Sequence, residues 1–273
     1  MGWSYWVDII WILTRLEELN LPQGATILDA GGGLGLLQYV LAARGYKVIS
    51  IDFSNRDPHF LHRWAFDIEV VNQRKPRPTT TYQEHVGTSN RYRRNLKALL
   101  DKVTKSRFNL IGYITLLVNQ RIKRSARGAI FMIQADIRHM HSIERHSVDA
   151  VISCSVIEHM EPRLIPEAIE ECRRVLKPNR PIILTTSAAE EKDWFHEPSK
   201  GWCFTKETIG SFFEKTEASG KWEGFDRFLS EYIRSEELKR RLASSYFVGG
   251  ENGMPWGIWD PKYIPAGVVS FSS

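Results

Sequence analysis

The chain has 273 residues, of which 42% are hydrophobic and 11% aromatic. This length and composition allow one large domain or two small ones around a buried core, and they exclude collagen-like, disordered and small disulfide-rich proteins. The net charge is +5, but residues 55–127 alone hold 16 Lys and Arg against 5 Asp and Glu. The other 200 residues therefore carry a net charge of −6, and the basic character belongs to one segment.

The N-terminal residues 1–22 predict a helix that caps the domain. Apolar residues recur there at helical spacing, at Trp6, Ile9, Ile10, Leu13 and Leu16. Asp8 interrupts the apolar stretch and Arg15 ends it, so the segment fits neither a signal peptide nor a membrane span. The chain has three cysteines and no C-x-x-C pair, which argues against a disulfide framework and a zinc ribbon. These features predict a cytoplasmic protein without a transmembrane segment.

Residues 25–52 predict a βαβ unit. A short apolar strand at 25–30 stops at three glycines, a helix follows at 34–44, and a second strand covers 46–52. Gly45 lies where a helix C-cap glycine belongs. A unit of this size predicts a parallel sheet with right-handed crossovers.

The same pattern resumes after the basic segment. Nearly all-apolar runs predict buried parallel strands at 129–134, 149–155 and 181–186. Helices are expected at 166–176 and at 204–215, the second with Thr205 as its N-cap. The C-terminal region 187–273 is expected to hold substrate-side loops, a charged helix at 225–242 and an edge strand at 267–271. Together these elements predict a single α/β domain with a Rossmann-like, doubly wound and mostly parallel sheet.

Residues 55–127 are too many for a simple crossover between the second and third strands. We interpret them as a basic, mostly helical insertion. Apolar residues at helical spacing predict one helix over 92–103 and a second over 108–122, behind a Pro- and Thr-rich breaker at 75–81. Three functions are open for it: a lid over a small acceptor, a dock for an anionic substrate such as a phosphorylated or nucleotide-linked sugar, and a helix that contacts anionic lipid at a membrane surface.

The sharpest motif is Asp29-Ala-Gly-Gly-Gly-Leu-Gly35, between the first strand and the helix that follows it. Glycines there let the backbone turn sharply and let a ligand approach the N-terminus of the helix. Asp52 ends the next strand, where a carboxylate can accept hydrogen bonds from ribose hydroxyls. The G-x-G-x-x-G spacing of dinucleotide-binding dehydrogenases does not fit, because Leu36 or Gln38 falls on the last glycine position. A Walker loop fails as well, because no G-K-[ST] follows.

The pattern D-x-G-x-G-x-G resembles that of the class I S-adenosylmethionine-dependent methyltransferases. The resemblance continues in Gln134-Ala-Asp-Ile137, after the third strand, and in Val148 to His159, which holds the fourth strand and its following loop. It implies that S-adenosylmethionine is the cofactor, that Asp52 holds its ribose and that Asp136 meets its adenine. The cofactor-binding residues that it implies are Asp29, Gly31, Gly33, Gly35, Asp52, Phe53, Asp136, Ile137 and Ser153.

Methyl transfer in such an enzyme is a displacement at a methyl group that a sulfonium already activates. The protein therefore mainly aligns the acceptor, and it supplies a base where the acceptor proton has a high pKa. His159 and Glu158 directly follow the fourth strand, and an imidazole titrates near neutral pH. His196 and Asp193 lie in the loop 187–203, which also follows a strand end, where such sheets bind ligands. The candidate catalytic residues are thus His159, Glu158 and His196, with Asp193 as a further candidate.

The acceptor is expected to be a small molecule. Methyltransferases that modify exocyclic amines of nucleic acids usually carry a proline-containing motif after the fourth strand, and 5-methylcytosine enzymes carry a Pro-Cys pair there, whereas this chain has Ser153-Cys-Ser-Val156. The sequence favours methyl transfer to an oxygen or nitrogen of a small metabolite or glycan precursor, including an anionic one. Two alternatives stay open: an RNA methyltransferase that uses the basic insertion, and a non-catalytic scaffold that binds the cofactor. The sequence proposes no metal ligands and predicts no oligomeric state.

Overall fold

The computed structural model describes residues 4–71, 118–119, 128–197, 199–214 and 263–272. The first elements in chain order are α1 (Tyr5–Glu18), β1 (Thr26–Ala30), α2 (Leu37–Ala43), β2 (Lys47–Asp52), α3 (Phe60–Ala65), β3 (Asp67–Val71) and β4 (Ala129–Gln134). The next are β5 (Ala150–Cys154), the 3-10 helices η1 (Ile157–His159) and η2 (Pro162–Leu164), α7 (Ile165–Val175) and β6 (Pro181–Ala188). The last are β7 (Trp194–His196), β8 (Gly201–Cys203), α8 (Lys206–Glu214) and β9 (Ile264–Phe271).

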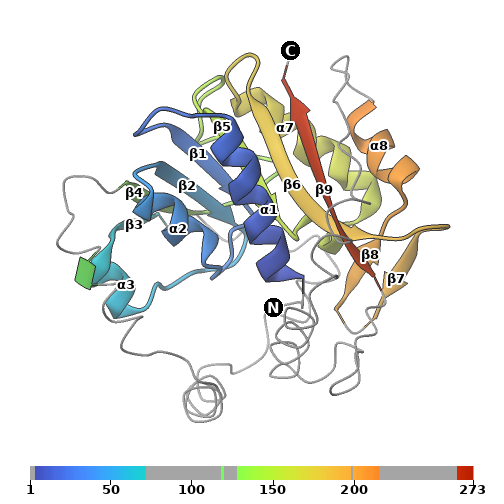
Figure 1. Ribbon diagram of the computed structural model, residues 1–273, viewed down its shortest axis with the longest axis horizontal. Coiled ribbons are helices and arrows are strands. Elements are labelled where there is room, and N and C mark those ends of the chain that lie inside the picture. The colour runs from blue at the N-terminus through green and yellow to red at the C-terminus, as the bar shows by residue number, and fades with distance from the viewer. Residues whose placement is uncertain (1–3, 72–117, 120–127, 198, 215–262, 273) are drawn as a thin grey trace, which may run out of the picture.

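One seven-stranded sheet forms the centre of the fold, in the order β3-β4-β2-β1-β5-β6-β9 (Figure 1). Every pair of neighbours is parallel except β6 and β9, which are antiparallel. The carboxyl ends of β1, β2, β4, β5 and β6 therefore meet at one edge of the sheet, where doubly wound folds bind their ligands. The predicted Rossmann-like α/β architecture is confirmed, and so is the C-terminal edge strand.

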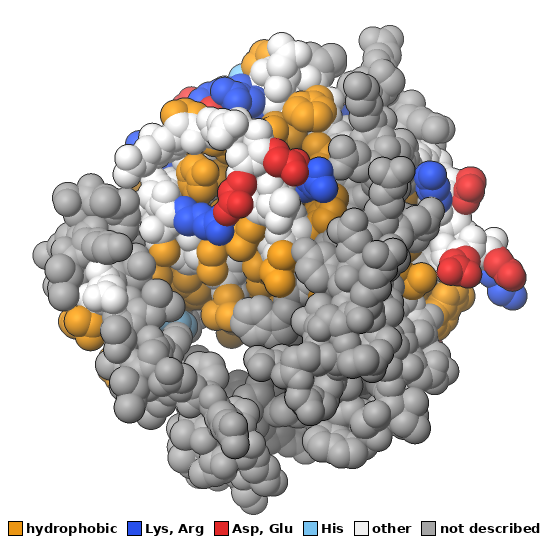
Figure 2. Space-filling view, in the orientation of Figure 1, with side chains coloured by type: hydrophobic (Ala, Val, Ile, Leu, Met, Phe, Trp, Pro, Cys, Tyr) orange, Lys and Arg blue, Asp and Glu red, His pale blue; other side chains and the backbone are white. Residues whose placement is uncertain are grey.

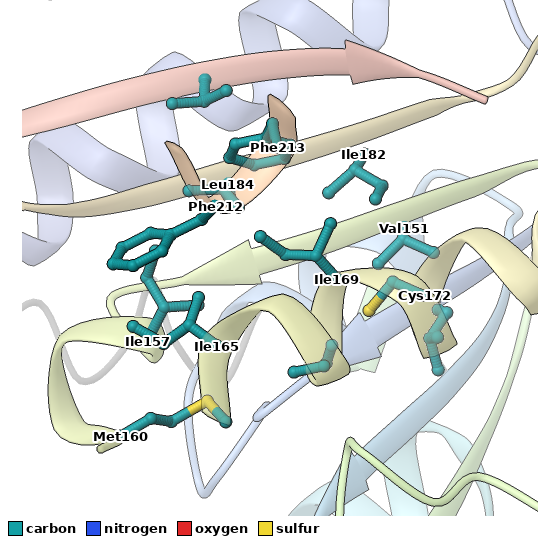
Figure 3. Close-up of a cluster of buried hydrophobic side chains, with 14 of the residues drawn as sticks. Val151, Ile157, Met160, Ile165, Ile169, Cys172, Ile182, Leu184, Phe212 and Phe213 are labelled. Atoms are coloured by element: carbon teal, nitrogen blue, oxygen red, sulfur yellow. The ribbon is translucent and has the colours of Figure 1, made fainter. Parts of the chain in front are cut away.

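Helices cover both faces of the sheet (Figure 1). On one face α1 and α2 pack against the central strands, with a cluster that includes Ile12, Leu41 and Ile130. On the other face α7 and α8 pack against β5 and β6, and Figure 3 shows Ile169 of α7 and Phe212 of α8 in this second cluster. Each fully buried aliphatic or aromatic side chain contributes about 1.5–3 kcal/mol to folding. The two clusters hold the sheet edge rigidly between two helical layers.

The N-terminal helix is confirmed, and its buried face matches the predicted one in part, since Ile9 and Leu16 are buried as predicted. Ile10 is 43% exposed, whereas Asp8 is fully buried together with Ile12. The helix packs along β5, β6 and β9, so the buried stripe follows the spacing of Asp8, Ile12 and Leu16. An acid thus faces the sheet from the capping helix.

The interpretation of 55–127 as a helical insertion between the second and third strands needs correction. Its first residues form the short helix α3 and the strand β3, which is the outermost strand of the sheet and pairs in parallel with β4. The strand at 129–134 is therefore the fourth strand along the chain, not the third. Val118 and Asn119 are helical, as predicted for 108–122, and the rest of that helix and the helix at 92–103 lie outside the described residues.

The sequence predicted a loop over 187–203, but part of this region forms strands. β7 and β8 form an antiparallel hairpin, and β8 lies against η1. The helix α8 follows, and Thr205 is its N-cap, because the Thr208 N–H donates to Thr205 Oγ1 over 3.3 Å. The charged helix expected at 225–242 lies outside the described residues.

The described surface shows mixed charge. Figure 2 shows acidic and basic side chains next to one another on the described part of one face. Two of the ion pairs join Arg44 to Glu17 and Arg15 to Glu18, each over 2.9 Å. None of the helices in the described ranges has the length and apolar content to cross a bilayer.

Candidate functional site

The glycine motif forms a tight loop at the end of β1. The N–H groups of Gly31 and Gly32 donate to the carbonyl of Ile51 over 2.8 and 3.1 Å, which fixes the loop to β2. Gly31 has φ +82° and Gly33 has φ +51°, in the left-handed region that favours glycine. A Cβ on Gly31 would lie 2.5 Å from the Val156 side chain. The loop backbone therefore lies against the segment that follows β5.

Asp52 lies at the end of β2 and faces this loop. Its Oδ2 accepts a hydrogen bond from the Gly33 N–H over 2.9 Å. Its Oδ1 accepts from the N–H of Ser54 over 2.8 Å and from the Ser54 hydroxyl. A carboxylate offers about four lone-pair sites, so three donors leave room for another hydroxyl. The structure brings Asp52 and the glycine loop together.

Asp29 lies beneath the loop instead of facing its open side. The side chain is 2% exposed, and its Oδ2 accepts a hydrogen bond from Ser50 Oγ over 3.0 Å. A Cβ on Gly32 would lie 2.1 Å from that oxygen, so the loop covers the carboxylate. Burial raises the pKa of Asp29 to about 6, although the Ser50 hydroxyl and the charge of Arg56 oppose the shift. The geometry gives Asp29 a supporting position.

Asp136 follows β4, two residues beyond the register partner of Asp52. Its carboxylate accepts hydrogen bonds from the Arg138 side chain, with Nε at 3.1 Å from both oxygens and Nη2 at 2.6 Å from Oδ2. Burial opposes ionisation, but the bonds from Arg138 hold the pKa of Asp136 below its usual value. Phe53 and Ile137, which flank this turn, are half-buried. The turn thus presents an ionised carboxylate, that of Asp136, next to two apolar side chains.

The carboxyl-terminal part of β5 supplies a buried hydroxyl, that of Ser153. Ser153 is 5% exposed, and its Oγ has no hydrogen-bond partner among the described residues. The next but one residue, Ser155, has φ +53° and donates its hydroxyl hydrogen to Asp8 Oδ2 over 3.2 Å. A buried hydroxyl normally has a partner, so Ser153 has capacity to bind a ligand atom.

Glu158 lies in η1 and is 3% exposed. Its Oε2 accepts a hydrogen bond from Thr186 Oγ1 over 3.2 Å. Burial raises the pKa of Glu158 to about 7. The pKa of Asp8 is also raised to about 7, mainly by burial and to a smaller extent by the negative charge of Glu158. Two buried carboxyl groups from distant parts of the chain thus influence each other at this edge of the sheet.

His159 is anchored by the hairpin. Its Nδ1 lies 2.9 Å from the carbonyl oxygen of Lys200, so this nitrogen carries the proton and donates it to the carbonyl. A Cβ on Gly201 would lie 3.2 Å from the imidazole, which explains why the hairpin has glycine next to it. Burial lowers the pKa of His159, and the bond to Lys200 opposes this shift. The ring is therefore neutral at pH 7, with Nε2 as its basic nitrogen.

His196 lies on the far strand of the same hairpin. It is 5% exposed, its Nδ1 lies 2.7 Å from the Ser199 hydroxyl, and burial lowers its pKa. Its ring packs edge-on against Tyr263, with centroids 5.4 Å apart. Asp193 is used by α8, because its Oδ1 accepts from the Thr205 N–H over 2.6 Å. The geometry thus gives Asp193 a capping position.

Two further residues at this edge were not singled out as site residues from the sequence. Tyr5 of α1 accepts a hydrogen bond from the Leu36 N–H over 3.2 Å, and its hydroxyl lies where a Cβ on Gly35 would be. Arg56 was counted with the basic insertion, yet it is 4% exposed beneath the glycine loop. The nearest sequence signal for Arg56 is its place four residues after Asp52.

These residues fit S-adenosylmethionine. The loop has no side chains at Gly31, Gly32 and Gly33, Asp52 keeps acceptor capacity for a ribose hydroxyl, and Ser153 has a buried hydroxyl without a partner among the described residues. The half-buried Phe53 and Ile137 offer apolar surface beside Asp136 for a flat aromatic ring. The donor and acceptor set therefore suits a nucleoside with a charged tail at the loop.

Comparisons with known proteins agree with this fit. The model of a methyltransferase domain family matches residues 9–243, most of the chain. No curated protein sequence matches the chain.

Solved structures share the fold at low sequence identity. A SAM-dependent methyltransferase from Leishmania major is 11% identical, with a TM-score of 0.50 over 98% of this chain and 72% of that one. The [4+2]-cyclase SpnF is 14% identical, with a TM-score of 0.52 over 97% of this chain and 80% of that one. A phosphoethanolamine N-methyltransferase from Haemonchus contortus, in complex with phosphomonomethylethanolamine and S-adenosylhomocysteine, is 15% identical, with a TM-score of 0.50 over 99% of this chain and 56% of that one.

Since one of these neighbours is a cyclase, the fold alone does not determine the reaction. The family match, which covers most of the chain, does identify the family. The chain therefore belongs to the class I S-adenosylmethionine-dependent methyltransferases, and S-adenosylmethionine is its cofactor.

Proposed function

We propose that the enzyme transfers a methyl group to an oxygen or nitrogen atom of a small metabolite or glycan precursor, with His159 as the base. The observation that carries this proposal is the hydrogen bond from His159 Nδ1 to the Lys200 carbonyl, over 2.9 Å, at the carboxyl end of β5. It fixes both the orientation and the tautomer of the imidazole. A fixed neutral imidazole suits an acceptor whose proton must be removed.

The cofactor side of the proposed site is built from the glycine loop and two strand ends. Gly33, where a Cβ would meet only Asp52 at 3.8 Å, leaves space for the methionine part, and Asp52 accepts from the ribose. Gly31 and Gly35 let the loop pack closely against Val156 and Tyr5. Ser153, whose hydroxyl has no partner within the described part of the chain, uses it for a polar atom of the cofactor. When bound, S-adenosylmethionine supplies a methyl group that its sulfonium makes electrophilic.

The adenine is placed beside the turn after β4 in this proposal. Phe53 and Ile137 contact its faces, and Asp136 accepts from its amino group while Arg138 keeps the carboxylate ionised. Asp29 stays beneath the loop and supports it, as its bond to Ser50 suggests.

The chain's own residues perform the proton transfer. The acceptor X–H loses its proton to Nε2 of His159, and the imidazole becomes an imidazolium that still donates to Lys200 through Nδ1. Glu158 is less accessible than His159 and burial raises its pKa to about 7, so we assign it a supporting position, held by the bond from Thr186, and not contact with the acceptor. His196 lies farther along the hairpin and shapes the acceptor side through its ring contact with Tyr263.

We further propose that residues 1–273 act as one methyltransferase domain, with 55–127 and 187–273 on the acceptor side. The basic charge of 55–127 favours an anionic acceptor, because a region with an excess of +11 attracts phosphate groups. On the face that Figure 2 shows, described acidic and basic side chains lie next to one another, which does not favour a nucleic-acid groove on that part of the surface.

Transfer from methyl-labelled S-adenosylmethionine to a fractionated cell extract tests this function. The label is expected in the small-molecule fraction with the intact enzyme, and in no fraction with Asp52→Ala. Label in the RNA fraction, lost on deletion of 90–127, would instead establish the RNA alternative. Cofactor binding by calorimetry with no labelled product in either fraction would establish the scaffold alternative.

The role of His159 has its own test. His159→Asn keeps a donor for the Lys200 carbonyl but no base, so kcat is expected to fall by about 10²- to 10⁴-fold while the Kd of S-adenosylhomocysteine is unchanged. His139→Asn, at an exposed histidine, is the matched control. An unchanged kcat in His159→Asn would show that His159 is not the base.

A further inference from the structure

Arg56 lies beneath the glycine loop, not on the surface of the basic segment in which it occurs. It is 4% exposed, and its guanidinium donates to four parts of the fold, of which α2 accepts through Gln38 Oε1 over 3.5 Å. Nη1 contacts Ser50 Oγ of β2 over 2.7 Å, and Nη2 contacts the carbonyl of Ile133 of β4 over 3.1 Å. Nη1 also contacts the carbonyl of Gly33 in the loop over 3.4 Å. One side chain thus joins β2, β4, α2 and the loop.

Arg56 also balances two buried carboxylates. The Ser50 hydroxyl accepts from Arg56 and donates to Asp29, so a continuous polar chain runs under the loop. Burial lowers the pKa of Arg56, and the negative charges of Asp52 and Asp29 oppose that shift. Asp52 and Asp29 are 7% and 2% exposed, and burying such charges is costly without a counter-charge.

We propose that Arg56 is a positioning residue for cofactor binding, which acts through Gly33 and Asp52 without touching the cofactor. It holds the Gly33 carbonyl from below, and the N–H of the same residue bonds Asp52 over 2.9 Å. The position of the Asp52 carboxylate, and hence its reach toward a ribose, then depends on Arg56. This inference rests on the proposed role of Asp52.

Lysine cannot replace Arg56 in this position. Arginine presents five donors in a rigid planar fork, whereas the lysine ammonium is a single point with three donors. Arg56 uses its fork to reach acceptors on β2, β4, α2 and the glycine loop at once. Arg56→Lys therefore keeps the counter-charge for Asp29 and Asp52 but loses the geometry that holds the loop.

The experiment measures the Kd of S-adenosylhomocysteine by calorimetry for four proteins: the intact enzyme, Arg56→Lys, Asp52→Ala and the double variant. The unfolding midpoint of each protein in urea, without ligand, shows whether it is folded. Arg63→Lys is the matched control, because Arg63 belongs to the same basic segment and its ion pair with Asp57 is exposed.

Arg56→Lys is expected to weaken binding by at least about tenfold, as for loss of a charged hydrogen bond, and Arg63→Lys by less than about twofold. In the Asp52→Ala background the same Arg56→Lys change is expected to weaken binding by less than about threefold, because the two residues act through one contact. A residue that only supports the fold would give equal effects in both backgrounds.

Unchanged binding in folded Arg56→Lys, or an effect as large in the Asp52→Ala background as in the intact enzyme, would overturn the proposal. If Arg56→Lys does not fold, Ser50→Ala, which removes one acceptor of Arg56 and leaves its charge, is expected to show the same dependence on Asp52. Absence of binding by the folded intact enzyme would instead refute the proposed cofactor site itself. The two failures are therefore distinguishable.

Discussion

The backbone N–H of Gly33 donates to Oδ2 of Asp52 over 2.9 Å, so the glycine loop and the end of β2 form one unit. Asp52→Ala removes the acceptor that holds this loop and that faces the proposed ribose site. Binding of S-adenosylhomocysteine is expected to weaken by about 1–3 kcal/mol, the usual cost of leaving polar partners unpaired. Calorimetry measures this change in binding free energy.

The control for this change is Asp57→Ala, at an exposed aspartate five residues along the chain. The loss of the Asp57 carboxylate is expected to change the Kd of S-adenosylhomocysteine by less than about twofold from that of the intact enzyme, since exposed ion pairs contribute little. Equal affinities for the Asp52→Ala and intact proteins would show that Asp52 does not contact the ligand.

The crowding at Gly31 gives a second prediction, about stability. Gly31 and Gly24 have nearly the same backbone angle, φ +82° and +81°, but only a Cβ on Gly31 would meet Val156, at 2.5 Å. Gly31→Ala is therefore expected to cost about 1–3 kcal/mol more unfolding free energy than Gly24→Ala. Urea denaturation of the two variants measures the difference.

The rescue variant Val156→Ala tests the cause of that difference. It removes the two methyl groups that a Cβ on Gly31 would approach, so Gly31→Ala is expected to cost less in this background. A cost that is the same with and without Val156 would assign the effect to the backbone angle alone.

The strands of the sheet were largely predictable because their sequences are continuous apolar runs. β4 at Ala129–Gln134 coincides with its predicted range, and its residues Ile130 and Met132 are buried in the cluster that α1 and α2 form with the sheet. β3 was missed because Asp67–Val71 alternates charged and apolar residues inside a charge-rich segment. Its pairing with β4 is a contact across a long stretch of sequence, which local patterning does not reveal.

The site was predictable as far as its motifs are local. The glycine loop and Asp52 follow from strand ends and glycine spacing, whereas Arg56 and Asp8 acquire their positions only through tertiary packing. Each of those two charges occurs where a surface position would be expected, Asp8 on a capping helix and Arg56 in a basic segment. Charge alone does not distinguish a solvated residue from one buried with a partner.

The hydrogen bonds that join Asp193 of the hairpin region to the start of α8 give a third prediction. Asp193 accepts from the Thr205 N–H over 2.6 Å and from the Thr208 hydroxyl over 2.8 Å. Asp193→Ala is expected to lower the unfolding free energy by about 1–2 kcal/mol, as for loss of a helix cap, and to leave kcat nearly unchanged. Glu190→Ala, at an exposed acid in the same region, is the control. A large fall in kcat without loss of stability would give Asp193 a catalytic role.

The buried pair Asp8 and Glu158 gives the fourth prediction, about pH. The pKa of each carboxyl is raised from near 4 to about 7, mainly by burial, and the charge of Glu158 contributes to the shift of Asp8. Tyr5 and Cys154 also feel the charge of Asp8, and both have pKa values raised mainly by burial. Between pH 4 and 7 the folded state therefore binds more protons than the unfolded state. Stability is fully present below about pH 4 for these groups and falls as pH rises through 7.

Asp8→Asn tests this dependence. The amide is neutral at every pH and keeps an oxygen that can accept from Ser155, so the decline in unfolding free energy between pH 4 and 7 is expected to be shallower. The scale is about 1.4 kcal/mol for each unit by which the folded and unfolded pKa values differ. Urea denaturation at several pH values measures the slope, with Asp57→Asn as the exposed control. Asp29, whose burial also raises its pKa, contributes equally to all three proteins. A slope in Asp8→Asn identical to that of the intact enzyme would mean that Asp8 is ionised in the folded state, which would require a cation against its buried carboxylate.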